Sequence, residues 1–426
     1  MKEVYRNATV LSVANVVGYI IPLLEVPILA RALGPESYGM VVLFQSIALI
    51  SSLIVEYGFN LSAARQVALA KNDPILLGRI FSDVFLAKII LSFLVMVALF
   101  ALSFTASAHR VVSNFEMLAW SAAYFVAFGF SPFWFFQGRE QLTGVIVLEF
   151  CLRLIGLSLL FVLIKSDQDA VLALAIMSAV GLTNTVLSTW WCFREVASFS
   201  ISLGGAIKQI SQGFYVFLYR SSNNILLNAA PPVLGYTVGP SALAVFVPAE
   251  KVVRGVVGFV APVLTALFPY FSRIYAEASA YSLRHAWLII CCAALGGAVA
   301  ATILSFYGPL LLNVVLGSQY ALAEKLLCWF VWIIPLRMTN QALGMVLLIP
   351  ARRDKAASSL LMIFSMLSLV LGGGLSTQFG VRGMVIGFIA AEAMLTISLL
   401  VVSRKVTSEF VLINLIPYKT EASRNK

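Results

Sequence analysis

Charged residues are scarce in this chain. They make up 11% of the 426 residues, against about 25% in soluble domains. Hydrophobic residues make up 61%, and the mean hydropathy is +0.95. No segment between the apolar runs is long enough for a large soluble domain, which excludes a catalytic domain on either side of a membrane. The composition therefore predicts an all-α polytopic membrane protein.

Residues that commonly carry metal or nucleotide chemistry are also few. The five cysteines lie in or beside apolar runs without metal-ligand spacing, and the two histidines, His109 and His285, are far apart in sequence. No GxxxxGK[ST] phosphate-binding loop occurs. We therefore expect no metal, no cofactor and no ATP-driven motor. The first apolar run, from Ala8, lacks a small-residue cleavage site, so we expect a retained helix rather than a signal peptide.

Apolar runs long enough to cross a bilayer as helices dominate the chain. One crossing takes about 20 residues. We expect twelve spans, at 8–30, 39–60, 80–104, 116–136, 142–164, 169–193, 212–236, 241–266, 286–307, 323–348, 357–378 and 381–403. An even number of spans places both termini on the same side of the membrane.

The loop charges predict which side that is. One set of loops and ends holds eighteen Lys and Arg residues and the other holds five, which are Arg31, Arg110, Lys165, Lys325 and Arg382. The positive-inside rule places the richer set, with both termini, in the cytoplasm. The net charge of +10 follows largely from this bias and does not indicate nucleic-acid binding. The tail 406–426 is expected to be cytoplasmic and to contact anionic lipid, and the aromatic run 133–136 is typical of an interfacial belt.

A weak internal repeat divides the chain. Five residues recur 205 positions later: Pro27, Leu29, Gly34, Pro35 and Val42 as Pro232, Leu234, Gly239, Pro240 and Val247. Chance recurrence of a Gly-Pro loop is the alternative. The repeat predicts two six-helix bundles, 1–200 and 201–405, related by a pseudo-twofold axis along the membrane normal. Prolines interrupt the first helix of each half, which is the sequence pattern of a transporter site or gate.

Charges inside the expected spans are the strongest functional signal. Glu250, Lys251 and Arg254 lie near the middle of 241–266, and Arg220 lies in the polar stretch of 212–236. A central Lys or Arg costs roughly 2.5–3.5 kcal/mol on insertion scales, so such residues usually face a polar interior. Guanidinium and ammonium groups suit phosphate oxygens. We interpret these residues as a cationic site for an anionic substrate, tuned by Glu250.

Three further charges leave alternatives open. Arg153 lies midway along 142–164 and either contributes to the cationic site or only neutralises Glu149 four residues earlier. Glu25 and Glu392 have no obvious partner on their own helices. Either carboxylate is therefore a candidate proton or ion site.

Several motifs resemble one transporter family. They are the turn 29–39 (LARALGPESYG), Glu56-Tyr57-Gly58 with the following Arg65, Pro132-x-Trp134-x-x-Gln137-Gly138, and Gly317-x-x-Tyr320. With the span count, they resemble the polysaccharide-exporter (O-antigen flippase, Wzx-like) branch of the multidrug/oligosaccharidyl-lipid/polysaccharide exporter superfamily. The turn motif is the strongest of these matches.

The resemblance implies what such a protein does. It implies two six-helix bundles around a cationic cavity, and translocation of an undecaprenyl-diphosphate-linked oligosaccharide from the cytoplasmic to the periplasmic leaflet of the bacterial inner membrane. A polysaccharide polymerase and a chain-length regulator are expected partners. Three alternatives remain: a multidrug or metabolite antiporter of the same superfamily, a membrane-embedded polymerase or ligase, and an assembly scaffold. Cationic drugs would favour acidic cavity residues, and an enzyme would favour a sizeable outside loop.

Overall fold

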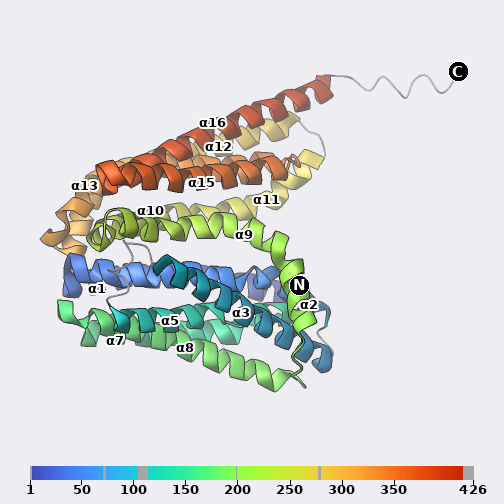
Figure 1. Cartoon of the computed structure of the whole chain (residues 1–426). Coiled ribbons are helices and arrows are strands. Elements are labelled where there is room, and N and C mark those ends of the chain that lie inside the picture. Colours follow the sequence, from blue (N-terminus) through green and yellow to red (C-terminus); the bar gives the residue numbers. More distant parts are fainter. Residues whose placement is uncertain (1, 71–72, 104–113, 198, 277–279, 416–426) are drawn as a thin grey trace. The chain divides into compact units, whose positions relative to one another are not determined.

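The structure, a computed structural model, describes residues 2–70, 73–103, 114–197, 199–276 and 280–415. Within these ranges the side chains of 2–20, 218–227, 409–415 and a few shorter stretches lie outside the described set. The described residues are almost entirely helical and include no strand (Figure 1). This is the expected result for apolar runs, because a helix satisfies its own backbone polar groups in lipid.

The helices follow one another with short connections. The first part of the chain contains α1 Lys2–Glu56, α2 Phe59–Leu69, α3 Pro74–Ser103, α5 Phe115–Gly129, α6 Phe133–Arg139, α7 Leu142–Leu163, η2 Asp167–Asp169, α8 Ala170–Glu195 and α9 Leu203–Thr237. The second part contains α10 Pro240–Gly258, α11 Val260–Ala276, α12 Ala280–Leu316, η3 Ser318–Tyr320, α13 Ala321–Phe330, α14 Ile333–Ala342, η4 Leu343–Leu348, α15 Asp354–Phe379 and α16 Val381–Leu415. Of these, η4 is a π-helical turn.

The long helix α1 is two spans in one. Fifty-five residues would extend about 80 Å, far more than the roughly 30 Å of hydrocarbon in a bilayer. Gly34 interrupts the helix with φ 72° and ψ 171°, a left-handed conformation that favours glycine. Pro35 follows and cannot donate a backbone hydrogen bond. The expected spans 8–30 and 39–60 therefore lie on either side of this kink.

Nine helical stretches in the described part of the chain are long and apolar enough to cross a membrane. They contain ten of the twelve expected spans, because Ile21–Leu69 holds both 39–60 and the end of 8–30. The expected span 212–236 falls in the more polar α9, and 323–348 is divided among α13, α14 and η4. The all-α polytopic class is confirmed, and the count of twelve stays a prediction.

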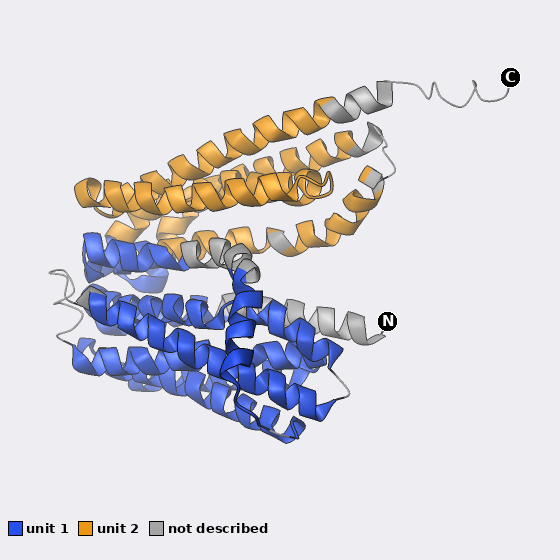
Figure 2. Ribbon diagram, turned by 45° about the vertical axis from the view of Figure 1, so that its right-hand side comes forward, with its two compact units in different colours: residues 1–248, 314–321 blue, residues 249–313, 322–426 orange. Residues whose placement is uncertain are grey.

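Packing groups the chain into two compact units. Unit 1 consists of residues 1–248 and 314–321, and unit 2 of residues 249–313 and 322–426 (Figure 2). Helix α9 belongs to unit 1, where it packs on α1, α2 and α3. The expected bundles 1–200 and 201–405 rest on the repeat and on membrane topology rather than on packing, so they stay a prediction.

The aromatic run 133–136 is not the interfacial belt that the sequence suggested. Trp134, Phe135 and Phe136 are buried inside unit 1, with exposures of 2%, 0% and 0%. The ring of Phe81 lies 6.0 Å from that of Trp134 and 5.8 Å from that of Phe135. Trp134 and Phe135 thus lie against α3, and the ring of Phe136 lies 5.4 Å from that of Trp191 in α8, so the run forms protein core.

Both repeated Gly-Pro pairs lie at helix junctions within unit 1. Gly239 has φ 118°, and Pro240 begins α10, as Pro35 begins the second half of α1. The two junctions pack against each other, because a Cβ atom on Gly39 would lie 2.1 Å from the carbonyl oxygen of Pro240. Only glycine permits this approach of the two backbones.

A second contact in unit 1 joins two helix ends. Arg31 donates from Nε to the carbonyl oxygen of Val315 at 2.7 Å and from Nη2 to that of Val314, in the last turn of α12. In return, the Tyr320 hydroxyl donates to the carbonyl oxygen of Ala30 at 2.8 Å. The last four carbonyls of a helix lack helical partners, and cations favour that end. The turn 29–39 and the segment 314–321 therefore cap each other's helix ends.

We predict that Gly39→Ala destabilises the protein. The added methyl would meet Pro240, and overpacking typically costs about 1–3 kcal/mol. Thermal unfolding of purified protein in detergent should show a lower midpoint. Gly374→Ala in α15 is the matched control, because a Cβ there meets nothing within 4 Å and alanine favours helix. Equal midpoints for the two variants would contradict the close junction.

Candidate functional site

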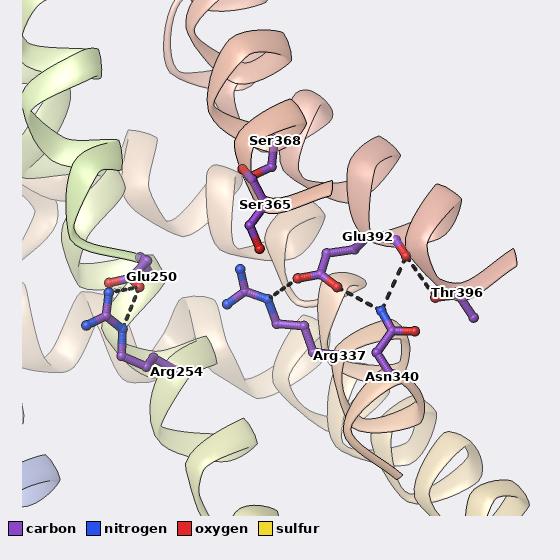
Figure 3. A network of polar contacts seen from close by, with 8 residues as sticks. All are labelled: Glu250, Arg254, Arg337, Asn340, Ser365, Ser368, Glu392 and Thr396. Atoms are coloured by element: carbon purple, nitrogen blue, oxygen red, sulfur yellow. Dashed lines mark hydrogen bonds and ion pairs between the residues drawn. The ribbon is translucent and has the colours of Figure 1, made fainter. Parts of the chain in front are cut away.

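The three charges near the middle of 241–266 lie on α10 (Figure 3 shows Glu250 and Arg254). Arg254 donates to Glu250 Oε1 from Nε at 2.7 Å and from Nη2 at 2.6 Å. Glu250 is buried, and Lys251 is half-buried beside it. The residue spacing places an acid and a base one helical turn apart, which allows this ion pair. The expected single helix ends at Gly258, and α11 begins two residues later.

Arg153 and Glu149 form the same kind of pair on α7. Arg153 donates to Glu149 Oε1 from Nε at 2.9 Å and from Nη2 at 2.7 Å. Glu25 of α1 is close enough to interact electrostatically with Arg153 and with Tyr124 of α5. Gln45 donates to the Tyr124 hydroxyl at 3.1 Å. Glu25 thus has polar neighbours on other helices, which sequence spacing along its own helix could not predict.

Glu392 has a partner on another helix too. On α16 its Oε1 accepts from Arg337 Nε at 2.9 Å, and its Oε2 accepts from Asn340 Nδ2 at 2.8 Å (Figure 3). Arg337 and Asn340 are three residues apart on α14 and share a face. Neither was a predicted site residue. The sequence signal was there, because both are polar within the apolar run 323–348, but helical spacing cannot pair residues 55 positions apart.

Arg220 lies in α9, but its side chain is outside the described residues. The structure therefore brings together Glu250, Lys251 and Arg254 on α10 and, separately, Arg153 with Glu25 in unit 1. Within unit 2, the basic residues deep in the described spans are Lys251, Arg254 and Arg337. The acidic residues there are Glu250 and Glu392. The acids offset most of the positive charge and leave one base in excess. Such a set can bind an anion without an uncompensated cluster of cations.

This architecture has known relatives. Residues 4–275 match the family described as polysaccharide biosynthesis protein. The chain belongs to this family. A protein of Escherichia coli (strain K12) and one of Shigella dysenteriae, each named "Putative O-antigen transporter", are 26% and 25% identical to it. The aligned regions cover 92% and 93% of this chain, and 94% and 98% of those proteins.

Solved structures support the fold. A multidrug resistance MATE family transporter of the MOP superfamily, in an inward-facing conformation, superposes with a TM-score of 0.69 at 16% identity, covering 92% of this chain and 96% of that chain. The lipid II flippase MurJ, in an inward closed conformation, gives a TM-score of 0.64 at 13% identity, covering 95% and 90%. The chain is a multi-pass membrane protein with the fold of these transporters.

We predict that Arg254→Gln is less stable than the double variant Glu250→Gln with Arg254→Gln. The single change removes the ion-pair partner of a buried carboxylate, whereas the double change leaves no charge behind. We expect a difference of about 1–3 kcal/mol, between the values for exposed and buried pairs. Thermal unfolding in detergent would measure it. A double variant no more stable than the single one would show that Glu250 does not depend on Arg254.

Proposed function

We propose that this protein is a flippase for lipid-linked oligosaccharides. Its substrate is an undecaprenyl-diphosphate-linked O-antigen or another polysaccharide repeat unit, which it moves from the cytoplasmic to the periplasmic leaflet. The observation that carries the proposal is membership of the polysaccharide biosynthesis family, with similarity over more than nine-tenths of the chain to two proteins that are each named "Putative O-antigen transporter". The fold, which is like that of a lipid II flippase, agrees with it.

The charged residues supply the chemistry. Lys251, Arg254 and Arg220 bind the diphosphate, because guanidinium and ammonium groups form charge-assisted hydrogen bonds with phosphate oxygens. Arg153 contributes from the N-terminal bundle. Glu250 reduces the net charge of the site, so that the diphosphate is held but can be released. Glu25 is the candidate for coupling to a proton or another ion.

Transport follows alternating access. The bundles 1–200 and 201–405 open the site first to the cytoplasm and then to the periplasm, while the polyprenyl tail stays in lipid. We place the protein in the bacterial inner membrane with both termini in the cytoplasm, as the loop charges indicate. A polysaccharide polymerase and a chain-length regulator would consume the flipped units.

Multidrug export is the main alternative, because a multidrug transporter shares the fold. Drugs handled by such antiporters are often cationic and would favour a surplus of acids. The deep charges of unit 2 have a surplus of one base, which favours an anionic substrate. A polymerase, a ligase or a scaffold accounts less well for these charges.

We predict that replacing Lys251 and Arg254 with Gln, together with Glu250→Gln so that no carboxylate loses its partner, abolishes export. Loss of two charge-assisted contacts should lower surface polysaccharide at least about tenfold. Surface polysaccharide and membrane-inserted protein should be measured together. Lys325→Gln with Arg382→Gln is the matched control, because it removes two exposed charges from the same unit. Full export by a stably inserted triple variant would refute the site.

We also predict that membrane potential alone drives flipping. Moving a negative charge outward across a membrane that is negative inside is downhill and releases roughly 2.3 kcal/mol per charge per 100 mV. Vesicles with an imposed potassium diffusion potential and no proton or sodium gradient should flip the lipid-linked substrate faster than vesicles at zero potential. Equal rates would exclude this driving force and direct attention to ion coupling at Glu25.

A further inference from the structure

Arg337 differs from the other arginines deep in the spans in how it contacts its glutamate partner. Arg254 and Arg153 each direct both Nε and Nη2 at one carboxylate oxygen. Arg337 uses Nε alone, at 2.9 Å from Glu392 Oε1. Among the described residues, no hydrogen bond or ion pair joins either of its Nη nitrogens to an acceptor. Four N–H donors of a side chain that is only 15% exposed are therefore left over.

The guanidinium group is nonetheless held in place. Glu392 receives Arg337 on one carboxylate oxygen and Asn340 on the other, at 2.8 Å. Since Arg337 and Asn340 come from one face of α14 and Glu392 comes from α16, two helices fix the group. The π-helical turn η4 starts three residues after Asn340, and such turns are frequent at functional sites.

The remaining donors point to a common side. In Figure 3 the Nη nitrogens of Arg337 are directed away from Glu392 and toward the side of the view where Glu250 and Arg254 lie. All of these residues belong to unit 2. A planar pair of Nη groups matches two oxygens of one phosphate, a geometry that a single ammonium group cannot reproduce.

We infer that Arg337 is a phosphate-binding residue of this transporter, and that Glu392 and Asn340 are its positioning residues. The ligand is the diphosphate of a polyprenyl-linked substrate, so the inference rests on the proposed function. It gives Glu392 a role other than ion coupling. Its carboxylate already accepts two hydrogen bonds, which leaves it less suited to receive a proton or a cation.

The test uses the full-length protein in nanodiscs and two probes, geranylgeranyl diphosphate and the uncharged alcohol geranylgeraniol. Wild type should bind the diphosphate more tightly. Arg337→Gln and Arg337→Lys should both weaken diphosphate binding, by about 10- to 100-fold, and leave alcohol binding unchanged, because Lys keeps the charge but loses the two-pronged contact. Arg382→Gln, an exposed arginine of the same unit, is the control. Phosphatidylglycerol as competitor separates a diphosphate site from one for anionic membrane lipid.

A charge exchange distinguishes ligand binding from a structural link. Arg337→Glu with Glu392→Arg keeps an ion pair between α14 and α16, so thermal stability should recover relative to either single change. Diphosphate binding should not recover, because the guanidinium group now starts from α16. Recovery of both properties would overturn the inference.

For Glu392, a positioning role and a purely electrostatic role predict opposite changes in diphosphate affinity. Glu392→Gln removes a negative charge, which by electrostatics alone would tighten anion binding. If Glu392 positions Arg337, diphosphate binding should instead weaken several-fold; tighter binding would overturn that role. Wild-type protein that does not prefer the diphosphate to the alcohol would overturn both this inference and the diphosphate part of the proposed function. Preference in wild type with equal binding by the Arg337 variants would overturn the inference alone.

Discussion

The structure depends on one constraint: a polar group that lies in hydrocarbon must find its partner in the protein itself. The backbone meets this constraint by forming helices, which is why the described residues contain no strand. Helix ends and kinks need further donors and acceptors. Arg31 and Tyr320 supply them where the last turn before the Gly34 kink meets the end of α12. Three arginines inside the spans meet the same constraint by pairing with glutamates.

These pairs differ in what they leave available. Arg153 and Arg254 are each saturated along one edge by an acid on the same helix, so a substrate must share or displace that contact. Arg337 is held through Nε by a glutamate on another helix, and its two Nη groups stay available for a ligand. Pairing with a glutamate on the same helix neutralises the charge of the arginine. Pairing with a glutamate on another helix orients a charge toward something else, which is the difference expected between a compensated residue and a binding residue.

Interactions between residues close in sequence were predictable, and those between residues far apart in sequence were not. Helices and the pairs four residues apart, such as Glu250 with Arg254, depend on local spacing and were foreseeable. The partner of Glu392 depends on which face of α16 meets α14, and no periodicity encodes that. The aromatic run 133–136 was misread for the same reason, because aromatic side chains suit an interface and a protein core equally well. The glycine contact at Gly39 needed the packing of the two turns, although the repeat had marked both.

A transporter has to be stable when empty as well as when loaded. A site of bare arginines would bind a diphosphate tightly, but each empty return would leave buried cations without acceptors, at a cost of several kcal/mol per charge. Glutamate partners lower that cost and narrow the difference in free energy between the loaded and empty states. Since transport requires release as well as binding, a nearly balanced set of charges with one base in excess suits the proposed flippase better than a strongly cationic site. The same constraint that shapes the fold thus also limits how tightly this protein can hold its substrate.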